Sequence, residues 1–565
     1  MSSKLKVVSG RSSAWGVVLL CGWLPLSGMA QVLNSPAIDP GAIQRQEREL
    51  LEQREREERL RERAVVPRVG VPADKSLTPP SEDKNILVKR FEVEPSEILS
   101  REEIDKILSP MLGQKVSLAD LQRAVAAINM LYEAKRELSA RAFLPTQTVK
   151  DGVVVIRLIE AKVGKISIQG LDVLKRSYVT DRLSLSTGTR LSIPGLEAEM
   201  LRFNRLNDSQ LRANVQPGEK FGSTDVLIDV VEARPWSGSL FADNAGRDTV
   251  GSERVGFNVK RSNLTGNSDF AQLTGLASEG SQNYSLAYSR PVTTRDLRLE
   301  TSYTFGKIQV IDGDFVPLDI NGYSTDFTVG LSKPFMVDAQ DLWLVYGKMS
   351  WRKSISKFGT FTQQNQDLRV VTMGVLGERR NDASSWSLDQ YLSVGVTGLG
   401  GEEDFIYYRA NATRFDRLNE NFQLVLRSGA QLTDTRYIPA GEQFQIGGSG
   451  TVRGFSEGLL SGRNGYFLST EIRVGEGTLA SLSRTPGDPV VQGFVFIDHG
   501  GAFPYRPGTQ KEIGRDDFLT SAGIGMLFDW QDFSGRITLG RPLIANVAEP
   551  NSFKTRVHAY VSYQF

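Results

Sequence analysis

Two short stretches of the sequence combine a charged side chain with small and apolar neighbours, a setting in which a charge needs a partner. The first is a glycine-rich loop that ends on Val452, Arg453, Gly454 and Phe455. The second is a run of phenylalanine and β-branched residues that ends on Asp498. Arginine and a carboxylate can form a bidentate ion pair. The candidate chemistry is therefore electrostatic attachment of a loop rather than bond making.

Several other kinds of chemistry are excluded by the residues that the sequence lacks. Cys21 is the only cysteine, and His499 and His558 are the only histidines, which leaves no H-E-x-x-H zinc motif and no Ser–His–Asp triad. No G-x-x-x-x-G-K-[ST] loop for nucleotides is present. The 67 basic and 66 acidic residues leave a net charge of +1, which gives no nucleic-acid footprint. We therefore expect no enzyme, no metal site, no cofactor and no nucleic-acid partner.

The first 30 residues are typical of a secretory signal peptide. A basic start is followed by an apolar core at 14–26 and by small residues before Gln31. The alternative is a short anchor helix, but the core is too short for one and is interrupted by Pro25. Cys21 lies inside this core, so the mature chain is expected to contain no cysteine.

A highly charged helix is expected over residues 41–63. Seven Arg and seven Glu balance there, and many of them stand three or four residues from an opposite charge. The few apolar residues make too narrow a stripe to pack on a hydrophobic core. The segment predicts either a solvated single helix or a polar helix inside a water-filled barrel. The residues that represent this helix are Ile43, Arg45, Leu50, Arg54 and Leu60.

Two small α+β domains are expected after a proline-rich linker. Four prolines in residues 64–85 keep the linker extended. The next segment reads strand, helix, helix, strand, strand, with a capping box at Ser100 and a second helix from Ser117. A further segment repeats this plan, and its first helix is expected at 178–185.

From residue 235 onward the hydrophobic pattern has a period of two. Apolar residues alternate with polar or small ones between Gly, Asn, Asp and Pro turns, a pattern typical of a transmembrane β-barrel. No stretch of the mature chain approaches the ~20 consecutive apolar residues of a spanning helix, so a membrane protein with this sequence must cross as a closed barrel. The expected divisions are a signal peptide at 1–30, a helical region at 31–63, a linker at 64–85, α+β domains at 86–163 and 164–234, and a barrel at 235–565.

The alternation around Asp498 indicates where its side chain points. Successive residues of a strand face opposite sides, so Val495 and Ile497 share one face and Phe496 and Asp498 share the other. The first face suits lipid, which places Phe496 and Asp498 on the lumen side. Arg453 could meet them there. The alternative is that Arg453 is an ordinary arginine of a solvent-exposed loop.

These motifs together resemble a known family. The pattern Q-F-x-I-G-G at 443–448, V-R-G-F at 452–455 and F-x-D at 496–498 resembles the TpsB outer-membrane transporters of two-partner secretion, the ShlB/FhaC/HecB-like family. That family belongs to the POTRA-plus-barrel superfamily that includes the barrel-assembly proteins. The stretch R-A-x-L-P-x-Q at 141–147 resembles part of the family's POTRA domain.

The resemblance implies a specific architecture. It implies a transmembrane β-barrel of sixteen antiparallel strands, preceded by two α+β POTRA domains and an N-terminal helix that plugs the resting pore. In the family the glycine-rich loop folds inward, so Arg453 would pair with Asp498 and pack on Phe496. The terminal Phe565 resembles the signal for insertion into the outer membrane.

The resemblance also implies a function. The POTRA domains, in the periplasm, would recognise an unfolded partner exoprotein, and the outer-membrane pore would translocate it to the cell surface without nucleotide hydrolysis. The partner would be a TpsA-type exoprotein, such as an adhesin, a haemolysin or a contact-dependent toxin. The lipid bilayer, and the barrel-assembly machinery during insertion, are the other expected partners. The alternatives are an insertase of the barrel-assembly kind, a passive porin and an enzyme.

Overall fold

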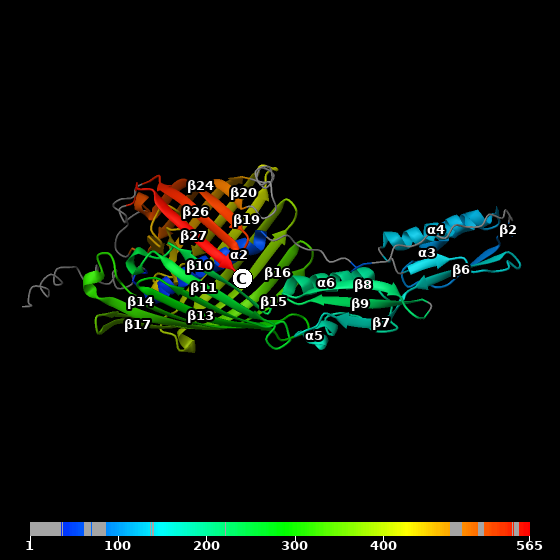
Figure 1. Ribbon diagram of the computed structural model, residues 1–565, viewed down its shortest axis with the longest axis horizontal. Coiled ribbons are helices and arrows are strands. Elements are labelled where there is room, and N and C mark those ends of the chain that lie inside the picture. Colours follow the sequence, from blue (N-terminus) through cyan, green and yellow to red (C-terminus); the bar gives the residue numbers. More distant parts are fainter. Residues whose placement is uncertain are drawn as a thin grey trace, which may run out of the picture.

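A barrel, a helix inside it and two small α/β domains in a row make up the protein (Figure 1). The computed structural model describes residues 36, 38–61, 69–70, 86–135, 137, 140–220, 222–474, 489–506, 513–544, 546 and 553–565. The expected signal peptide and most of the expected linker lie outside the described residues.

Sixteen antiparallel strands form the closed barrel, and each pairs with the next in the chain apart from an inserted hairpin of two short strands, β21 and β22. The barrel closes where β27 pairs with β10. The expectation of sixteen strands is confirmed. The strands are β10 Trp236–Asp243, β11 Arg254–Ser262, β12 Phe270–Ala277, β13 Ser281–Pro291, β14 Arg298–Gln309, β15 Ile320–Val337, β16 Asp341–Phe358, β17 Phe361–Arg380, β18 Ser384–Gly395, β19 Phe405–Arg417, β20 Phe422–Leu432, β23 Asn464–Val474, β24 Val490–Phe503, β25 Phe518–Trp530, β26 Phe533–Pro542 and β27 Arg556–Gln564.

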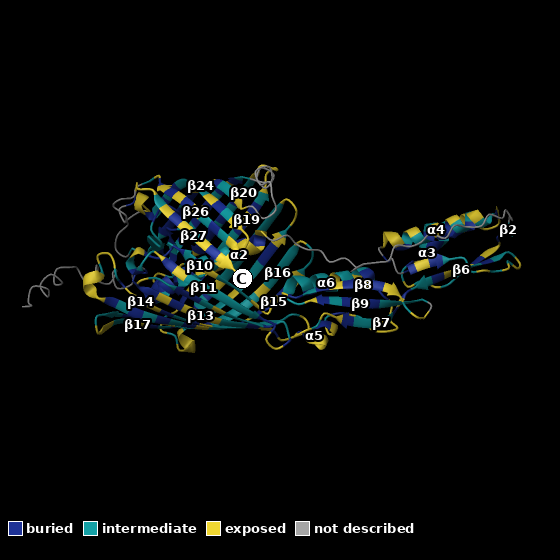
Figure 2. Ribbon diagram, viewed as in Figure 1, coloured by how far each residue is buried: buried dark blue, intermediate teal, exposed yellow. Residues whose placement is uncertain are grey.

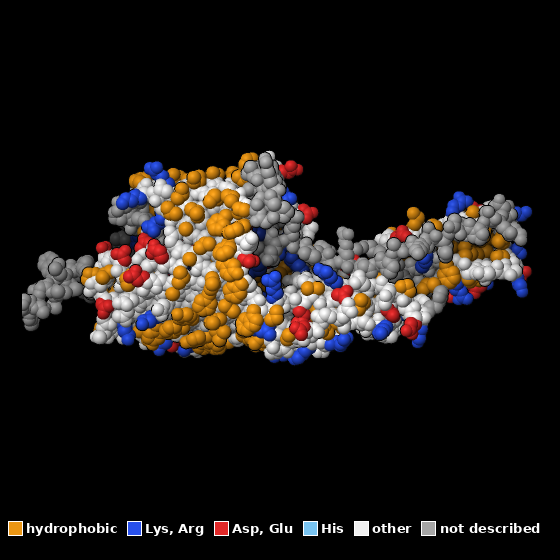
Figure 3. All heavy atoms as spheres, in the orientation of Figure 1, with side chains coloured by type: hydrophobic (Ala, Val, Ile, Leu, Met, Phe, Trp, Pro, Cys, Tyr) orange, Lys and Arg blue, Asp and Glu red, His pale blue; other side chains and the backbone are white. Residues whose placement is uncertain are grey.

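Side chains alternate between the two faces of the barrel wall. In β24, Val495 and Ile497 are each 52% exposed, whereas Phe496 is 5% and Asp498 is 0% exposed. Figure 2 shows a similar alternation of buried and exposed residues along other strands, such as β26 and β27. Hydrophobic side chains gather over the outer face of the barrel (Figure 3), as expected where strands meet lipid. Among the described helices, none is both long and apolar enough to span a membrane.

The first α/β domain packs two helices on small sheets. A three-stranded sheet has the order β3–β6–β5, and β2 pairs with β4. Ser100 and Ser117 each cap a helix with a reciprocal capping box, which confirms both expected helix starts. The elements are β2 Ile86–Leu87, β3 Arg90–Val93, α3 Arg101–Leu108, β4 Lys115–Val116, α4 Leu118–Ala134, β5 Ala140–Phe143 and β6 Val153–Glu160.

The second α/β domain repeats this plan with one difference from the sequence prediction. Its first helix ends at Thr180, whereas a helix over 178–185 was expected. Asp181 ends the helix, and Leu183 packs into the domain core from a non-helical segment. The apolar residues after Thr180 suggest one face of a helix, but a non-helical segment buries Leu183 equally well. The elements are β7 Lys162–Gln169, α5 Arg176–Thr180, α6 Ile193–Leu206, β8 Gln210–Pro217 and β9 Ser223–Val231, in a sheet of order β1–β8–β9–β7 whose β1 is Val69–Gly70.

The helix α2, Pro40–Arg61, lies inside the barrel (Figure 1). Asp39 caps it, because its carboxylate accepts the Ala42 N–H at 2.7 Å. The helix starts against β15 and β16, where Gly41 N donates to Ser354 Oγ at 3.3 Å, and ends where Ser385 Oγ donates to Leu60 O at 3.0 Å. It therefore runs through the barrel towards the end that carries the α/β domains.

Short 3₁₀ helices complete the described elements. They are η2 Ser109–Met111, η3 Asp248–Val250, η4 Val316–Leu318, η5 Thr397–Leu399, η6 Ala440–Glu442 and η7 Arg515–Asp517.

Candidate functional site in the barrel lumen

The connection between β20 and β23, residues 433–463, folds into the barrel and is called the lumen loop below. It contains η6 and a hairpin of β21 Phe444–Ile446 and β22 Leu460–Gly462. Val452 and Phe455 are completely buried in an apolar cluster with Phe444, Phe467 and Leu519, among others. This dry cluster fixes the loop against β23, β24 and β25.

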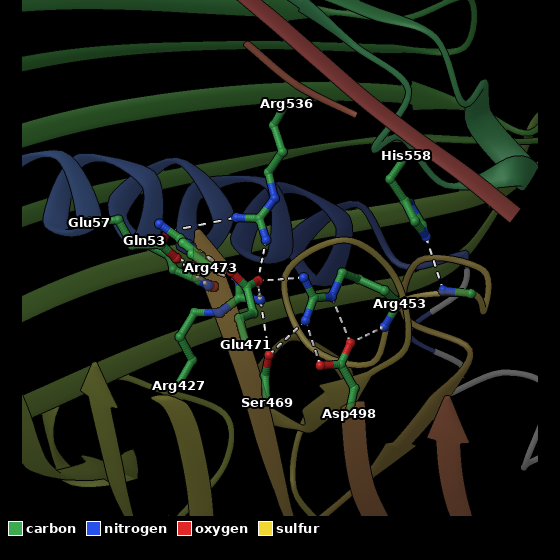
Figure 4. Close-up of polar contacts among 11 residues, drawn as sticks. Gln53, Glu57, Arg427, Arg453, Ser469, Glu471, Arg473, Asp498, Arg536 and His558 are labelled. Carbon is green, nitrogen blue, oxygen red and sulfur yellow. Dashed lines mark hydrogen bonds and ion pairs between the residues drawn. The ribbon is translucent and has the colours of Figure 1, made fainter. Parts of the chain in front are cut away.

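Arg453 holds the tip of the lumen loop to the barrel wall (Figure 4). Its Nε and Nη2 donate to the two oxygens of Asp498, each at 2.7 Å, and its backbone N–H donates to Asp498 Oδ2 at 3.0 Å. Nη1 donates to Glu471 Oε1 at 2.5 Å, and Nη2 also donates to Ser469 Oγ at 3.0 Å. The guanidinium lies 3.6 Å from the centre of the Phe496 ring.

Gly454, at the tip of the loop, is a position that requires glycine. Its φ is +89°, and a Cβ there would lie 2.9 Å from the carbonyl carbon of Gly540. Its N–H donates to His558 Nε2 at 3.1 Å, so β27 also contacts the tip. The four motif residues therefore divide their roles between apolar packing, an ion pair and a close backbone approach.

The structure brings Arg453, Phe496 and Asp498 together, as the resemblance implies, and adds other residues. Glu471 accepts from Arg427 at 3.0 Å and from Arg473 at 2.7 Å, and it also contacts Arg536. We call these residues the arginine cluster, made of Arg427, Arg453, Arg473 and Arg536 with Ser469, Glu471 and Asp498. One signal could have revealed part of it, since Ser469, Glu471 and Arg473 alternate with outward-facing residues in β23.

The basic and the acidic side chains of α2 both contact residues of opposite charge, on the barrel wall and on the lumen loop. Arg45 contacts Glu442 of the lumen loop at 2.5 Å, and Arg54 contacts Asp243 of the wall at 2.7 Å and lies 4.2 Å from the centre of the Tyr560 ring. Of the two alternatives predicted from the sequence, α2 is therefore the polar helix inside a barrel, held by specific ion pairs, and not a solvated single helix. Further pairs are Arg48–Asp326, Arg56–Asp389, Arg59–Glu378, Glu47–Arg254, Glu49–Arg409 and Glu57 with Arg427 and Arg536.

Apolar residues of α2 do pack against the barrel, whereas the sequence predicted that their stripe is too narrow to pack on a hydrophobic core. Ile43 is buried against Val250 and Ile308, and Leu60 is buried against Phe415 and Val425. A narrow stripe is sufficient here because the wall offers two small separate apolar patches rather than one core. The third apolar residue chosen from the sequence, Leu50, lies 3.2 Å from a Cβ built on Gly450 and so faces the lumen loop.

Space remains beside the helix. A cavity of about 530 Å³ runs along α2 between Gln44 and Glu58 and is bordered mostly by polar residues of the wall. Because this cavity is polar and far larger than one water molecule, it can hold water. The described residues contain no group of three or more metal-ligating side chains.

Phe565 contributes to the seam that closes the barrel. Its backbone N–H and C=O are both hydrogen-bonded to Gly238, each at 3.0 Å. Its ring is partly exposed and lies 6.4 Å from that of Tyr563, centre to centre. The last side chain thus belongs to an outward-facing aromatic group beside the junction of β10 and β27.

The second α/β domain is held on the barrel by an ion-pair clamp. Asp296, in the turn between β13 and β14, accepts from Arg202 Nε at 2.8 Å and from Arg182 Nε at 3.3 Å. The Arg182 guanidinium lies 3.7 Å from the centre of the Tyr178 ring. Burial raises the pKa of Tyr178, so this ring stays neutral at physiological pH.

Comparisons with known proteins agree with this architecture. Residues 222–528 match the family described as haemolysin secretion/activation protein ShlB/FhaC/HecB, and residues 86–161 match the ShlB-type POTRA domain. The heme/hemopexin transporter protein HuxB of Haemophilus influenzae is 24% identical, over 79% of this chain and 81% of its own. The outer membrane transporter CdiB of Escherichia coli is 23% identical, over 90% and 88%.

Solved structures show the same fold. CdiB from Escherichia coli superposes with a TM-score of 0.67 at 20% identity, covering 93% of this chain and 98% of that one. BamA from Haemophilus ducreyi, lacking POTRA domains 1–3, gives a TM-score of 0.56 at 14% identity, covering 85% and 100%.

Proposed function

The chain belongs to the haemolysin secretion/activation protein family ShlB/FhaC/HecB, and on this premise we propose that α2 is a removable plug in a pore that secretes a partner exoprotein. Members of this family are protein transporters of the outer membrane, with their POTRA domains in the periplasm. The first and second α/β domains of this chain are its two POTRA domains.

The observation that carries the proposal is the position of α2 in the lumen. The helix occupies the path that a polypeptide would take, and ion pairs rather than a continuous hydrophobic core hold it there. Water in the adjoining cavity can solvate these charges as the helix leaves. A polar lumen of this kind suits passage of an unfolded chain with mixed side chains.

The POTRA domains would capture the unfolded exoprotein by strand addition to a sheet edge. In the second domain the edge strand β8 already pairs with β1, which lies in the expected linker. In the first domain β3 and β5 stand at the two edges of the three-stranded sheet. We propose that capture uses an edge of the first domain, with folding of the exoprotein outside the cell driving export without nucleotide hydrolysis.

The partner is proposed to be a large TpsA-type exoprotein. The names of the similar proteins include a hemolysin transporter of Proteus mirabilis as well as HuxB and CdiB. An adhesin, a haemolysin or a contact-dependent toxin would each fit this setting. Phe565 and its strand would be recognised by the barrel-assembly machinery during insertion.

An outer-membrane insertase is the second candidate. The likeness to the BamA fold favours it. Against it stands α2, because a helix with matched charges along its length serves to close a lumen rather than to fold other barrels. No observation favours a catalytic role.

Single-channel conductance in a planar bilayer tests the proposed function. The mature protein is compared with a variant that lacks residues 31–63. We expect the deletion to convert brief, small openings into a large and steady conductance, because the lumen loses its main occupant. Unchanged conductance would mean that α2 does not control the pore and would favour the insertase.

A further inference from the structure

Glu57 of α2 lies against the arginine cluster (Figure 4). It is buried, and its carboxylate oxygens lie 3.5 Å from Arg427 Nη1 and 3.9 Å from Arg536 Nη1. Gln53, one turn earlier in the helix, donates to Glu57 Oε1 at 3.3 Å and orients it. A carboxylate on the removable helix is thus shared by two arginines of the fixed wall.

The helix supplies one carboxylate, Glu57, to the arginine cluster, and it also brings Arg61 near Arg473. With α2 in place, four guanidinium groups meet three carboxylates, namely Glu57, Glu471 and Asp498. When α2 leaves, two carboxylates remain for the same four arginines. Glu471 is already shared among all four, and both Asp498 oxygens are used by Arg453. Arg427 and Arg536 therefore each lose one of their two carboxylate partners when the helix leaves.

We propose that Arg427 and Arg536 form a carboxylate-binding site, which Glu57 fills at rest and which an acidic side chain of the passing exoprotein fills after the plug has left. The inference rests on the proposed function, since the site is vacated only if α2 moves. Two guanidinium groups converging on one point are suited to a planar carboxylate, whose two oxygens can each accept a hydrogen bond.

The site is reachable, and it differs from other arginines of the wall. A cavity of about 110 Å³ is bordered by Glu57, Arg427 and Arg536, so a small carboxylate can reach the space that a shortened side chain would free. Arg254 gives the contrast. It also faces α2 through Glu47, but it keeps its own wall partner Asp243 at 2.8 Å whether or not the helix is present.

The binding site is tested by chemical rescue in the full-length protein. Glu57→Ala removes the resident carboxylate, and Glu58→Ala is the matched control, because Glu58 is the next residue of the same helix and is exposed. Both variants lose one negative charge. Thermal unfolding in detergent and opening frequency in a bilayer are measured in sodium acetate and in sodium chloride of equal ionic strength.

We expect Glu57→Ala to open about tenfold more often than the wild type in chloride, because a charge-assisted contact is lost. Acetate should return the opening frequency to near the wild-type value and raise the unfolding temperature of this variant alone. Equal effects of acetate and chloride, or an equal response of Glu58→Ala, would overturn the carboxylate site.

The two readouts separate the site from the plug. If acetate stabilises Glu57→Ala but the openings do not change in any condition, the binding site stands and the plug proposal fails. If Glu57→Ala opens more often and acetate changes neither readout, the plug proposal stands and the carboxylate site is wrong.

Discussion

The lumen loop and α2 are attached to the same barrel wall by the same kind of ion pair, yet their surroundings differ. The side chain of Arg453 is 1% exposed and donates to two carboxylates and a hydroxyl. On the helix, the side chains of Arg54 and Arg56 are 20% and 17% exposed, and each contacts a single carboxylate of the wall. The loop also has a dry apolar cluster, whereas the helix has two small separate apolar contacts and lies along a polar cavity that the loop shares.

On the proposed function, this difference accounts for one kind of interaction holding both a permanent part and a removable part. When a buried ion pair loses one member, a charge is left without water or a partner. When a pair beside a polar cavity separates, water replaces the lost contact and the cost is small. On the proposed function, burial and the number of contacts, rather than the residue types, are what make the loop fixed and the helix releasable.

Removing Arg453 should have the largest effect. Arg453→Met leaves Asp498 and Glu471 without their shared partner, so we expect a loss of about 3–5 kcal/mol in the free energy of unfolding. The stability of Arg453→Lys should lie between those of the wild type and Arg453→Met. Lysine keeps the positive charge, but one ammonium group cannot replace the bidentate contact. Heat-modifiability on gels measures both variants. Wild-type stability of Arg453→Met would show that the loop is not held by this residue.

A glycine exchange within the lumen loop should have the next largest effect. Gly454→Ala forces a side chain into positive φ and against the backbone of Gly540, at a cost of about 1–3 kcal/mol. Gly450→Ala is the matched control, since its φ is ordinary and its new Cβ meets only the flexible ends of Leu50 and Gln53. The same gel assay compares the two. Equal stability would mean that the tip of the loop can shift freely.

Loss of one arginine from α2 should change opening rather than stability. For Arg54→Gln we expect the opening frequency to rise about three- to tenfold, as the loss of a partly exposed pair at about 1 kcal/mol implies. Arg59→Gln is the control, because Arg59 is 47% exposed and 3.8 Å from Glu378. Bilayer recordings measure openings, and gels should show both barrels intact. A large loss of barrel stability in Arg54→Gln would contradict the comparison, because the ion pairs of the helix would then stabilise the barrel as those of the loop do.

Salt should have the smallest effect and act on only one of the two regions. Raising the ionic strength from 0.1 M to 1 M shortens the Debye length from about 10 Å to about 3 Å, which weakens the partly exposed pairs of α2 more than the buried pairs of the loop. Opening frequency should therefore increase while the unfolding temperature of the barrel stays constant. If the unfolding temperature fell as the opening frequency rose, salt would weaken the ion pairs of the helix and of the loop alike, and the two regions would not differ.

The sequence was sufficient for the part of the site that lies in short motifs. Arg453 stands in the motif V-R-G-F and Asp498 in the motif F-x-D, and strand alternation places Asp498 and Phe496 on one face, as the structure has them. Glu471 follows from the same alternation in β23, although its role was not recognised. The fold was predictable because a period of two persists over hundreds of residues.

Other parts of the site depend on neighbours that no local pattern reveals. Arg427 and Arg536 join the cluster through β20 and β26, and only closure of the barrel decides which inward side chains meet. The patches that receive Ile43 and Leu60 are likewise built from residues of different strands or loops. An isolated inward apolar residue looks like any other strand position in the sequence.

The central claim is that α2 must leave the lumen for the pore to open, and a disulfide tests it most directly. A Cβ built on Gly41 lies 3.4 Å from the Ser354 Cβ, close to the separation of about 3.5–4.5 Å found in disulfides. The variant G41C/S354C would tie the helix to β16. A pair of cysteines at Ser285 and Thr304, which face each other on β13 and β14, is the control that leaves α2 free.

Conductance is recorded for both double variants under oxidising conditions and again after reduction. We predict that oxidised G41C/S354C shows only small, brief openings and that reduction restores wild-type openings, while the control pair is unaffected by either treatment. Large openings in fully oxidised G41C/S354C would contradict the claim, because the pore would then open with its helix still in place.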